Sequence, residues 1–255
     1  MKKKIVLAFV LAIFTVLLIT GCSVSKDKEV NEEKKILSIY CGAGMRKPFE
    51  EIVSKFETEN KCDVNVTYAN AAQIQTQINT SKEGDLFVAG SQDELKPIEE
   101  VVSDRKDLVK HIPVLAVQKG NPKNIKGLND LTNEDIKVVL GDYESTPIGK
   151  IAKKSLSDAS IFEKVNIIAN TATAPELINA LSSGECDAVI VWKENTENPN
   201  IEIVETTDLD KYIKTVPVAT LNCSENTETV KLFLDFLDTD SAKSIWANYG
   251  YEILN

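Results

Sequence analysis

The chain has 255 residues and a net charge of −10, with 29 lysines and arginines against 39 acidic residues. With 43% hydrophobic residues it is an acidic globular protein, which excludes a disordered chain and argues against nucleic-acid binding. Its single histidine, His111, leaves little room for metal sites or histidine-based catalysis.

Residues 1–21 have the pattern of a signal peptide, because Lys2–Lys4 precede an apolar run from Ile5 to Ile19. This run is short for a membrane span, and an uncleaved anchor helix is the alternative. It ends in Ile19-Thr-Gly-Cys22, which resembles a bacterial lipobox, so we expect Cys22 to carry a lipid such as palmitate. Residues 22–35 are polar and charged, and they are predicted to form a tether.

Strands and helices alternate in the segment that follows. Strands are predicted at 36–41, 62–68 and 85–89, and helices at 48–60, 71–78 and 92–102. This order requires a mainly parallel sheet with helices on both faces. A further strand is expected at 111–117, before the loop signal Lys119-Gly-Asn-Pro122.

The second half repeats this alternation and then becomes helical. Strands are predicted at 136–140, 166–169, 188–192 and 216–221, and helices at 148–156, 175–181, 227–237 and 241–249. We therefore expect an α/β fold of two lobes, each a mainly parallel sheet flanked by helices. Lobe 1 would contain residues 36–117 plus 216–255, lobe 2 residues 118–215, and a ligand cleft would lie between them.

Four predicted strand-to-helix loops would face this cleft, and all consist of small or neutral residues. They are 42–45, 69–72, 144–149 and 170–174. Each opens a helix, and the unpaired N–H groups and positive dipole end of a helix N-terminus favour an anion. The alternative interpretation is ordinary turn chemistry, because small residues are common at helix starts.

The cysteines and the histidine show no pattern of a reactive site. Cys41, Cys62 and Cys186 lie in or beside apolar runs, and together with Cys223 they form no CxxC pair. We expect buried thiols, with disulfides as the alternative. His111 has no cysteine or histidine pattern around it, so we assign it no functional role.

Six segments in collinear order resemble one bacterial family. They are ILSIYCGAGMRKPFEEIVSKF (36–56), TYANAAQIQTQI (67–78), DLFVAGSQDEL (85–95), VVLGDYESTPIGKIAKKSL (138–156), GECDAVIVW (184–192) and VKLFLDFLDTDSAKSIWANYGYE (230–252). They are similar to the molybdate-binding proteins, which are the solute receptors of ABC importers. The resemblance implies a two-lobed periplasmic-binding-protein fold of type II that closes on its ligand.

The resemblance also implies a set of ligand-binding positions. The family's two first-lobe serines fall on Gly44 and Ala71, so both hydroxyls are missing here. Its backbone amide donors fall on Ile148 and Ala174. Its tyrosine falls on Trp192, for which a packed aromatic at a strand end is the alternative role.

Neighbouring groups complete the predicted site. Met45 follows Gly44 in the first loop, and polar groups that could replace the missing hydroxyls are Asn70, Ser91, Gln92 and Thr173. Each lost hydrogen bond to a charged ligand costs about 1.5–3 kcal/mol, so the identity of the anion stays open.

The expected function is therefore delivery of an oxyanion, molybdate or tungstate, to the permease of an ABC importer. We expect a lipid-anchored monomer on the extracytoplasmic face of the cell membrane, with no cofactor, metal ion or nucleic-acid partner. Alternatives are a receptor for a sulfate-like, phosphate-like or carboxylate anion, and a sensor or adhesin on the same fold. The absence of Walker, GxSxG and HExxH motifs argues against an enzyme.

Overall fold

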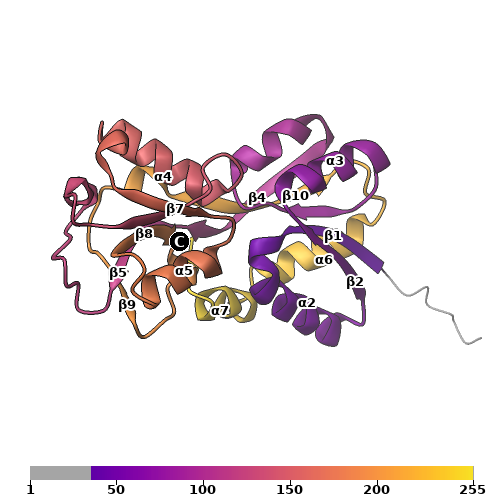
Figure 1. Ribbon diagram of the computed structural model, residues 1–255. Helices are drawn as coiled ribbons and strands as arrows, with labels where there is room; N and C mark the ends of the chain where they lie inside the picture. The colour runs from indigo at the N-terminus through magenta and orange to yellow at the C-terminus, as the bar shows by residue number, and fades with distance from the viewer. Residues whose placement is uncertain (1–35, 255) are drawn as a thin grey trace, which may run out of the picture. The chain divides into compact units, whose positions relative to one another are not determined.

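Two β-sheets organise residues 36–254, the part of the chain that the computed structural model describes (Figure 1). The first sheet has the strand order β11-β4-β10-β3-β1-β2, and the second has the order β7-β6-β8-β5-β9. The predicted signal peptide, Cys22 and the predicted tether lie outside the described residues. Within residues 36–254, no helix is long and apolar enough to cross a membrane.

The first sheet combines a parallel half with an antiparallel half. β1 pairs in parallel with β2 and β3, whereas β10 runs antiparallel to both β3 and β4, and β11 pairs antiparallel with β4. The strand bounds are β1 Ile36–Gly42, β2 Asp63–Ala69, β3 Leu86–Val88, β4 Val102–His111, β10 Lys214–Leu221 and β11 Glu252–Ile253. The strands expected to carry the ligand loops are thus the parallel ones.

Helices α2 (Arg46–Asn60), α6 (Thr227–Leu237) and α7 (Asp240–Asn248) pack on one face of the first sheet (Figure 1). Phe56 and Phe233 meet edge to face with ring centroids 4.8 Å apart, and Phe49 lies 6.0 Å from Phe233. These rings are fully buried, so they join the N-terminal and C-terminal parts of the chain in one core.

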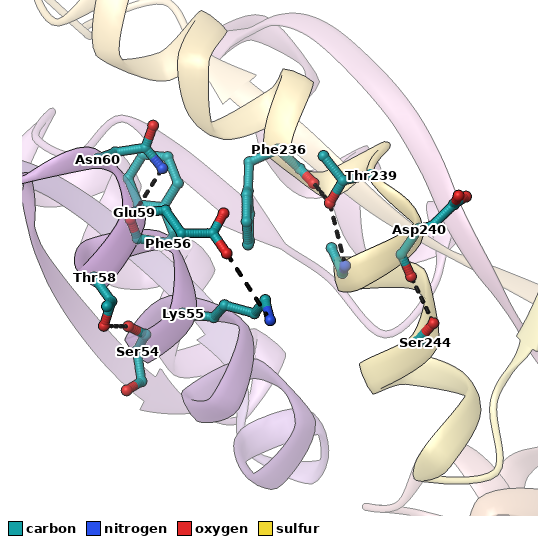
Figure 2. Close-up of polar contacts among 11 residues, drawn as sticks. Ser54, Lys55, Phe56, Thr58, Glu59, Asn60, Phe236, Thr239, Asp240 and Ser244 are labelled. Carbon is teal, nitrogen blue, oxygen red and sulfur yellow. Dashed lines mark hydrogen bonds and ion pairs between the residues drawn. The ribbon is translucent and has the colours of Figure 1, made fainter.

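The end of α2 lies beside the junction of α6 and α7 (Figure 2). Phe56 and Phe236 are in contact with ring centroids 5.4 Å apart. Thr239 donates a hydrogen bond of 2.7 Å to the Phe236 carbonyl and accepts one of 3.2 Å from the Ala242 amide. It therefore caps α7 and fixes the turn after α6.

The other face of the first sheet is covered by α3 (Ala71–Ser81) and by the 3₁₀ segment η2 (Gln92–Val101). Ile74 and Ile78, one helical turn apart in α3, are fully buried there. We predicted an α-helix at 92–102, but Pro97 interrupts the segment, and Ile98 has non-helical dihedral angles.

The second sheet is built in the same way. β6 (Val138–Gly141) pairs in parallel with β7 (Ile167–Thr171) and β8 (Ala188–Trp192), and β5 (Pro113–Gln118) runs antiparallel to β8 and β9 (Ile201–Ile203). Helices α4 (Pro147–Asp158) and α5 (Ala174–Ser182) pack against this sheet. The 3₁₀ turns are η1 Ala43–Met45, η3 Leu128–Thr132, η4 Phe162–Lys164, η5 Lys193–Asn195 and η6 Asp210–Tyr212.

The chain crosses between the sheets at Ile112, between β4 and β5, and it returns through Ile213 before β10. We predicted one strand at 111–117 within lobe 1. Instead, His111 ends β4 in the first sheet, whereas Pro113–Val117 pair with β8 in the second. The sequence could not reveal the crossover, because the alternation of buried residues continues unchanged from Val109 and His111 through Pro113 and Leu115.

None of the four described cysteines forms a disulfide, as the sequence predicts. Cys41, Cys62 and Cys186 are buried thiols, and Cys223 is half-buried. Burial raises the pKa of Cys186 to about 12, and the pKa of Cys41 is also raised by burial. Both groups are therefore neutral thiols at physiological pH.

Candidate anion site at the helix N-termini

The predicted ligand residues lie at the carboxyl edges of the parallel strands. β3, β1 and β2 are adjacent in the first sheet, so Ser91, Gly44 and Ala71 follow three neighbouring strands. β7, β6 and β8 are adjacent in the second sheet, where Ala174, Ile148 and Trp192 follow or end the strands. Each sheet thus gathers its own half of the predicted site along one edge.

Gly44 lies in the short 3₁₀ turn η1 between β1 and α2. It is exposed, and a Cβ atom placed on it would meet no atom within 4 Å. Packing therefore does not require glycine at this position. Met45, the residue before α2, points its side chain into the first-sheet core, so only its backbone is available to a ligand.

Asn70 and Ala71 form the N-terminus of α3. The side-chain oxygen Oδ1 of Asn70 accepts a hydrogen bond of 2.9 Å from the Gln73 backbone amide, and the side-chain oxygen of Gln73 accepts one of 3.3 Å from the Asn70 backbone amide. This reciprocal capping box uses the side-chain oxygen of Asn70, so its side-chain NH₂ is the donor that a ligand could engage. Ala71 is half-buried immediately after it.

Ile148 lies in the first turn of α4, which is packed tightly against the end of β6. Thr146 caps this helix by accepting a hydrogen bond of 3.1 Å from the Gly149 amide. A Cβ atom on Gly149 would come within 2.3 Å of the Gly141 carbonyl oxygen. Glycine at 149 therefore allows the helix N-terminus, with the backbone N–H of Ile148, to approach the strand end.

Ala174 begins α5, and a carboxylate already occupies part of its loop. Thr173 caps the helix, and Glu176 accepts hydrogen bonds from the amides of Ala172 (3.0 Å) and Thr173 (3.2 Å). Two amides of this loop are thus satisfied within the protein. The Ala174 amide, one residue further on, is the donor that the family resemblance implies.

A second carboxylate lies just after β3, in the first turn of η2. Glu94 is half-buried and accepts a hydrogen bond of 2.8 Å from the Gly90 amide. Burial raises its pKa, whereas the Gly90 hydrogen bond and the electrostatic effect of His111 oppose this shift. Ser91, which follows Gly90, is the N-cap residue of η2 and makes no side-chain capping hydrogen bond. Its hydroxyl is therefore not used by the helix end.

Trp192 ends β8 and is 8% exposed. Its indole stacks on the imidazole of His111, with ring centroids 3.6 Å apart and an angle of 20° between the planes. His111 belongs to the first sheet, so this stack joins the predicted tyrosine-equivalent position to the other half of the site. The sequence contained no motif for this contact, because the two residues lie in separate strands of different sheets.

A surface hollow of about 280 Å³ lies at the crossovers, lined by residues that include Ile112, Lys193, Ile213 and Glu252. It contains none of the predicted ligand residues. No cluster of acidic, histidine or cysteine residues within 36–254 could hold a metal ion.

This arrangement of two sheets, with small-residue loops opening helices at their carboxyl edges, is that of a solute receptor. The chain belongs to the bacterial extracellular solute-binding proteins, whose family model matches residues 37–252. This is a family of binding proteins rather than enzymes.

Two relatives define the relationship further. "Putative ABC transporter substrate-binding lipoprotein YvgL" of Bacillus subtilis is 26% identical and covers 95% of this chain and 96% of its own length. The molybdate-binding protein ModA of Escherichia coli is 24% identical, covering 87% of this chain and 90% of its own length.

A solved structure confirms the fold. The "substrate binding domain of putative molybdenum ABC transporter from Clostridium difficile" has a TM-score of 0.75 and 26% identity, and the match covers 87% of this chain and all of that one. The predicted fold, that of type II periplasmic binding proteins, is thereby confirmed.

Proposed function

We propose that this protein is the receptor of an ABC importer, and that it binds a small oxyanion, with molybdate or tungstate as the first candidates. Family membership supports the receptor role, and the relatives that are named as molybdate-binding proteins support the choice of anion. The observation that carries the proposal is the convergence of helix N-termini at the carboxyl edge of each sheet.

In the proposed mechanism, the anion is held by backbone N–H groups. The amides of Ile148 and Ala174 would bind it from the second sheet, and the loops at Gly44 and Ala71 would bind it from the first. An anion that contacts the loops of both sheets stabilises the closed conformation, in which the two sets of loops are closest. The permease would recognise that closed conformation. The net negative charge does not oppose binding, because charges beyond about 8–10 Å are screened at physiological salt.

A different small anion is the second candidate. Gly44 and Ala71 lack the two hydroxyls that the family uses, and Gly44 has open space where a serine side chain would fit. A site that depends on amides and on Asn70 or Ser91 would also suit sulfate, phosphate or a small carboxylate. A sensor or adhesin role on the same fold would require no permease.

Lipid anchoring is also part of the proposal. Cys22 follows the lipobox-like segment, and the Bacillus relative is named a lipoprotein. A protein anchored through Cys22 would incorporate labelled palmitate and remain with the membrane, whereas the Cys22→Ser variant would do neither. Equal labelling of both proteins would refute the anchor.

Thermal unfolding with a panel of anions tests the proposed ligand. The mature protein would be heated with molybdate, tungstate, sulfate, phosphate, thiosulfate or citrate. An anion at about a thousand times its Kd stabilises a protein by roughly 4 kcal/mol. For a chain of this size that corresponds to a rise in Tm of about 8–16 °C. A rise with molybdate and tungstate alone supports the first candidate, and a rise with another anion supports the second. No rise with any of the six refutes the oxyanion proposal.

A further inference from the structure

His111, the only histidine of the chain, makes polar contacts to both sheets. Its Nδ1 atom lies 3.0 Å from the carbonyl oxygen of Gly90, in the loop after β3 of the first sheet. Its Nε2 atom lies 2.8 Å from a carboxylate oxygen of Glu194, in the turn after β8 of the second sheet. The side chains of His111 and Glu194 are only 11% and 8% exposed.

These two contacts determine how many protons the pair holds. A carbonyl oxygen and a carboxylate oxygen can only accept hydrogen bonds, and a neutral imidazole has a single N–H donor. Satisfying both contacts therefore needs one more proton than a neutral imidazole and a carboxylate together carry. The Tyr251 hydroxyl is also hydrogen-bonded to Glu194, and a carboxylate suits two donors better than a protonated acid does.

The groups packed around the ring favour a positive charge on it. The indole of Trp192, from β8, stacks on the imidazole at 3.6 Å, within the range of a cation–π interaction. Glu194 faces the ring from η5, and the half-buried Glu94 of η2 interacts with the ring electrostatically. Tyr251, which follows α7, is buried with its ring centroid 6.0 Å from that of His111.

The nearby lysines have a carboxylate partner of their own. Lys110, which precedes His111, pairs with Glu252, and the Lys193 ammonium lies 3.6 Å from the same carboxylate. Both lysine ammonium groups are thus paired with the Glu252 carboxylate. Glu252 therefore provides a matched acidic residue close to the cluster but outside the contacts of the imidazole.

Glu194 is held in place by the backbone that follows α7. Gly250 has φ of +84°, and a Cβ atom on it would lie 3.0 Å from the Cα atom of Glu194. Glycine at this position lets residues 249–251 pass closely against Glu194 and bring the Tyr251 hydroxyl to its carboxylate.

We infer that His111 is an imidazolium that positions the Gly90–Ser91 loop against the second sheet, and is thereby a positioning residue for the anion site. The inference rests on the proposed function in one respect only, namely that Ser91 and its neighbours bind the anion. The proton on the ring and the position of the loop are properties of the protein without ligand. Loss of the charge partner, Glu194, would remove one ring proton, and the charge-assisted hydrogen bond from Nδ1 to the Gly90 carbonyl would become a weaker neutral one.

Nuclear magnetic resonance of histidine-labelled protein tests the proton directly, because the chain has one imidazole. At neutral pH, the ring nitrogens of the wild type should both carry protons. The Glu194→Gln variant, which keeps the shape of the side chain, should show one protonated and one unprotonated nitrogen. The Glu252→Gln variant is the matched control and should keep both protons. A single ring proton in the wild type would overturn the inference.

The backbone amide signals of Gly90 and Ser91 test the positioning role. They should shift in Glu194→Gln and stay in place in Glu252→Gln, with both variants checked for an unchanged fold by their thermal unfolding. Unchanged amide signals in Glu194→Gln would overturn the positioning role even if the ring proton is lost.

Anion affinity links the inference to function and separates its failure from that of the proposed function. For whichever anion of the panel binds, Glu194→Gln should weaken binding by about tenfold, the loss expected for one weakened hydrogen bond to a charged ligand. Equal affinity in both variants would refute a role in binding. If the wild type binds none of the six anions, the proposed function fails, and the proton count and amide signals still decide the inference.

Discussion

Restoring the two family serines at positions 44 and 71 should strengthen molybdate binding. A Cβ atom on Gly44 meets no other atom within 4 Å, so a serine side chain fits there without displacing a neighbour. Ala71 is the first residue of α3, where its side chain is half-buried beside the capping residue Asn70. Each hydroxyl would donate one hydrogen bond to the anion.

The size of the effect follows from the charge of the acceptor. A hydrogen bond to a charged group contributes about 1.5–3 kcal/mol, which corresponds to roughly 10- to 100-fold in Kd. Because Gly44 has open space, no steric cost offsets this gain. Isothermal titration of Gly44→Ser, Ala71→Ser and the double variant with molybdate would measure it.

A matched control is available at the far end of α4. Ala159 is exposed at the C-terminus of this helix, opposite the end that carries Ile148, so Ala159→Ser adds a hydroxyl away from the predicted site. It should leave the Kd for molybdate unchanged. If Gly44→Ser and Ala71→Ser also leave it unchanged, positions 44 and 71 do not face the ligand, and the assignment of the site is refuted.

Three further variants test the electrostatics and packing. Burial raises the pKa of Glu94 above its ordinary 4.5, so the ionised carboxylate lowers the free energy of unfolding at neutral pH. The free energy of unfolding therefore rises as the pH falls and the carboxylate takes up a proton. Glu94→Gln should therefore melt above the wild type at pH 7, with the difference shrinking below about pH 4.5; an equal difference at both pH values would contradict this. Gly149→Ala places a Cβ within 2.3 Å of the Gly141 carbonyl oxygen, so denaturant unfolding should show a loss of about 1–3 kcal/mol, and an unchanged midpoint would refute the close approach. Phe233→Ala should lower the free energy of unfolding by about 3–5 kcal/mol, because it leaves a cavity in the core under α2. The neighbouring Leu232 side chain is 41% exposed, so Leu232→Ala should lower it far less. Similar losses in the two variants would show that Phe233 is not a core residue.

The parallel half of each sheet could be predicted because local patterns specify it. β1 and β6 are short apolar runs ended by glycine, and each is followed by a helix whose apolar period continues for several turns. β4 could not be predicted in this way. Half of its residues, in the sequence VSDRKDLVKH, are charged, and among the ten only Val109 and His111 are buried. Pairing with β10, more than a hundred residues later, makes it a strand.

The site itself stays a prediction. Small residues at helix starts indicate the loops 144–149 and 170–174, because N–H groups at a helix N-terminus are unpaired whatever the side chains. The family resemblance, rather than the loop pattern, selects the amides at 148 and 174. Glu94 and Glu176 accept hydrogen bonds from amides three or four residues before them, and Thr173 and Glu176 form a capping box, so these contacts are local. The contact of His111 with Glu194 across the two sheets depends on tertiary structure alone. No local pattern links residues that only the folded chain brings together.

The central claim is that one anion is held by helix N-termini from both sheets. Crystals of the mature protein grown with tungstate would locate the metal by its anomalous scattering. The account predicts a single strong peak within hydrogen-bond reach of the Ile148 and Ala174 amides and of the loops at Gly44 and Ala71. A peak that touches only one sheet, a peak in the hollow at Ile112 and Ile213, or no peak in a protein that binds tungstate in solution would contradict it.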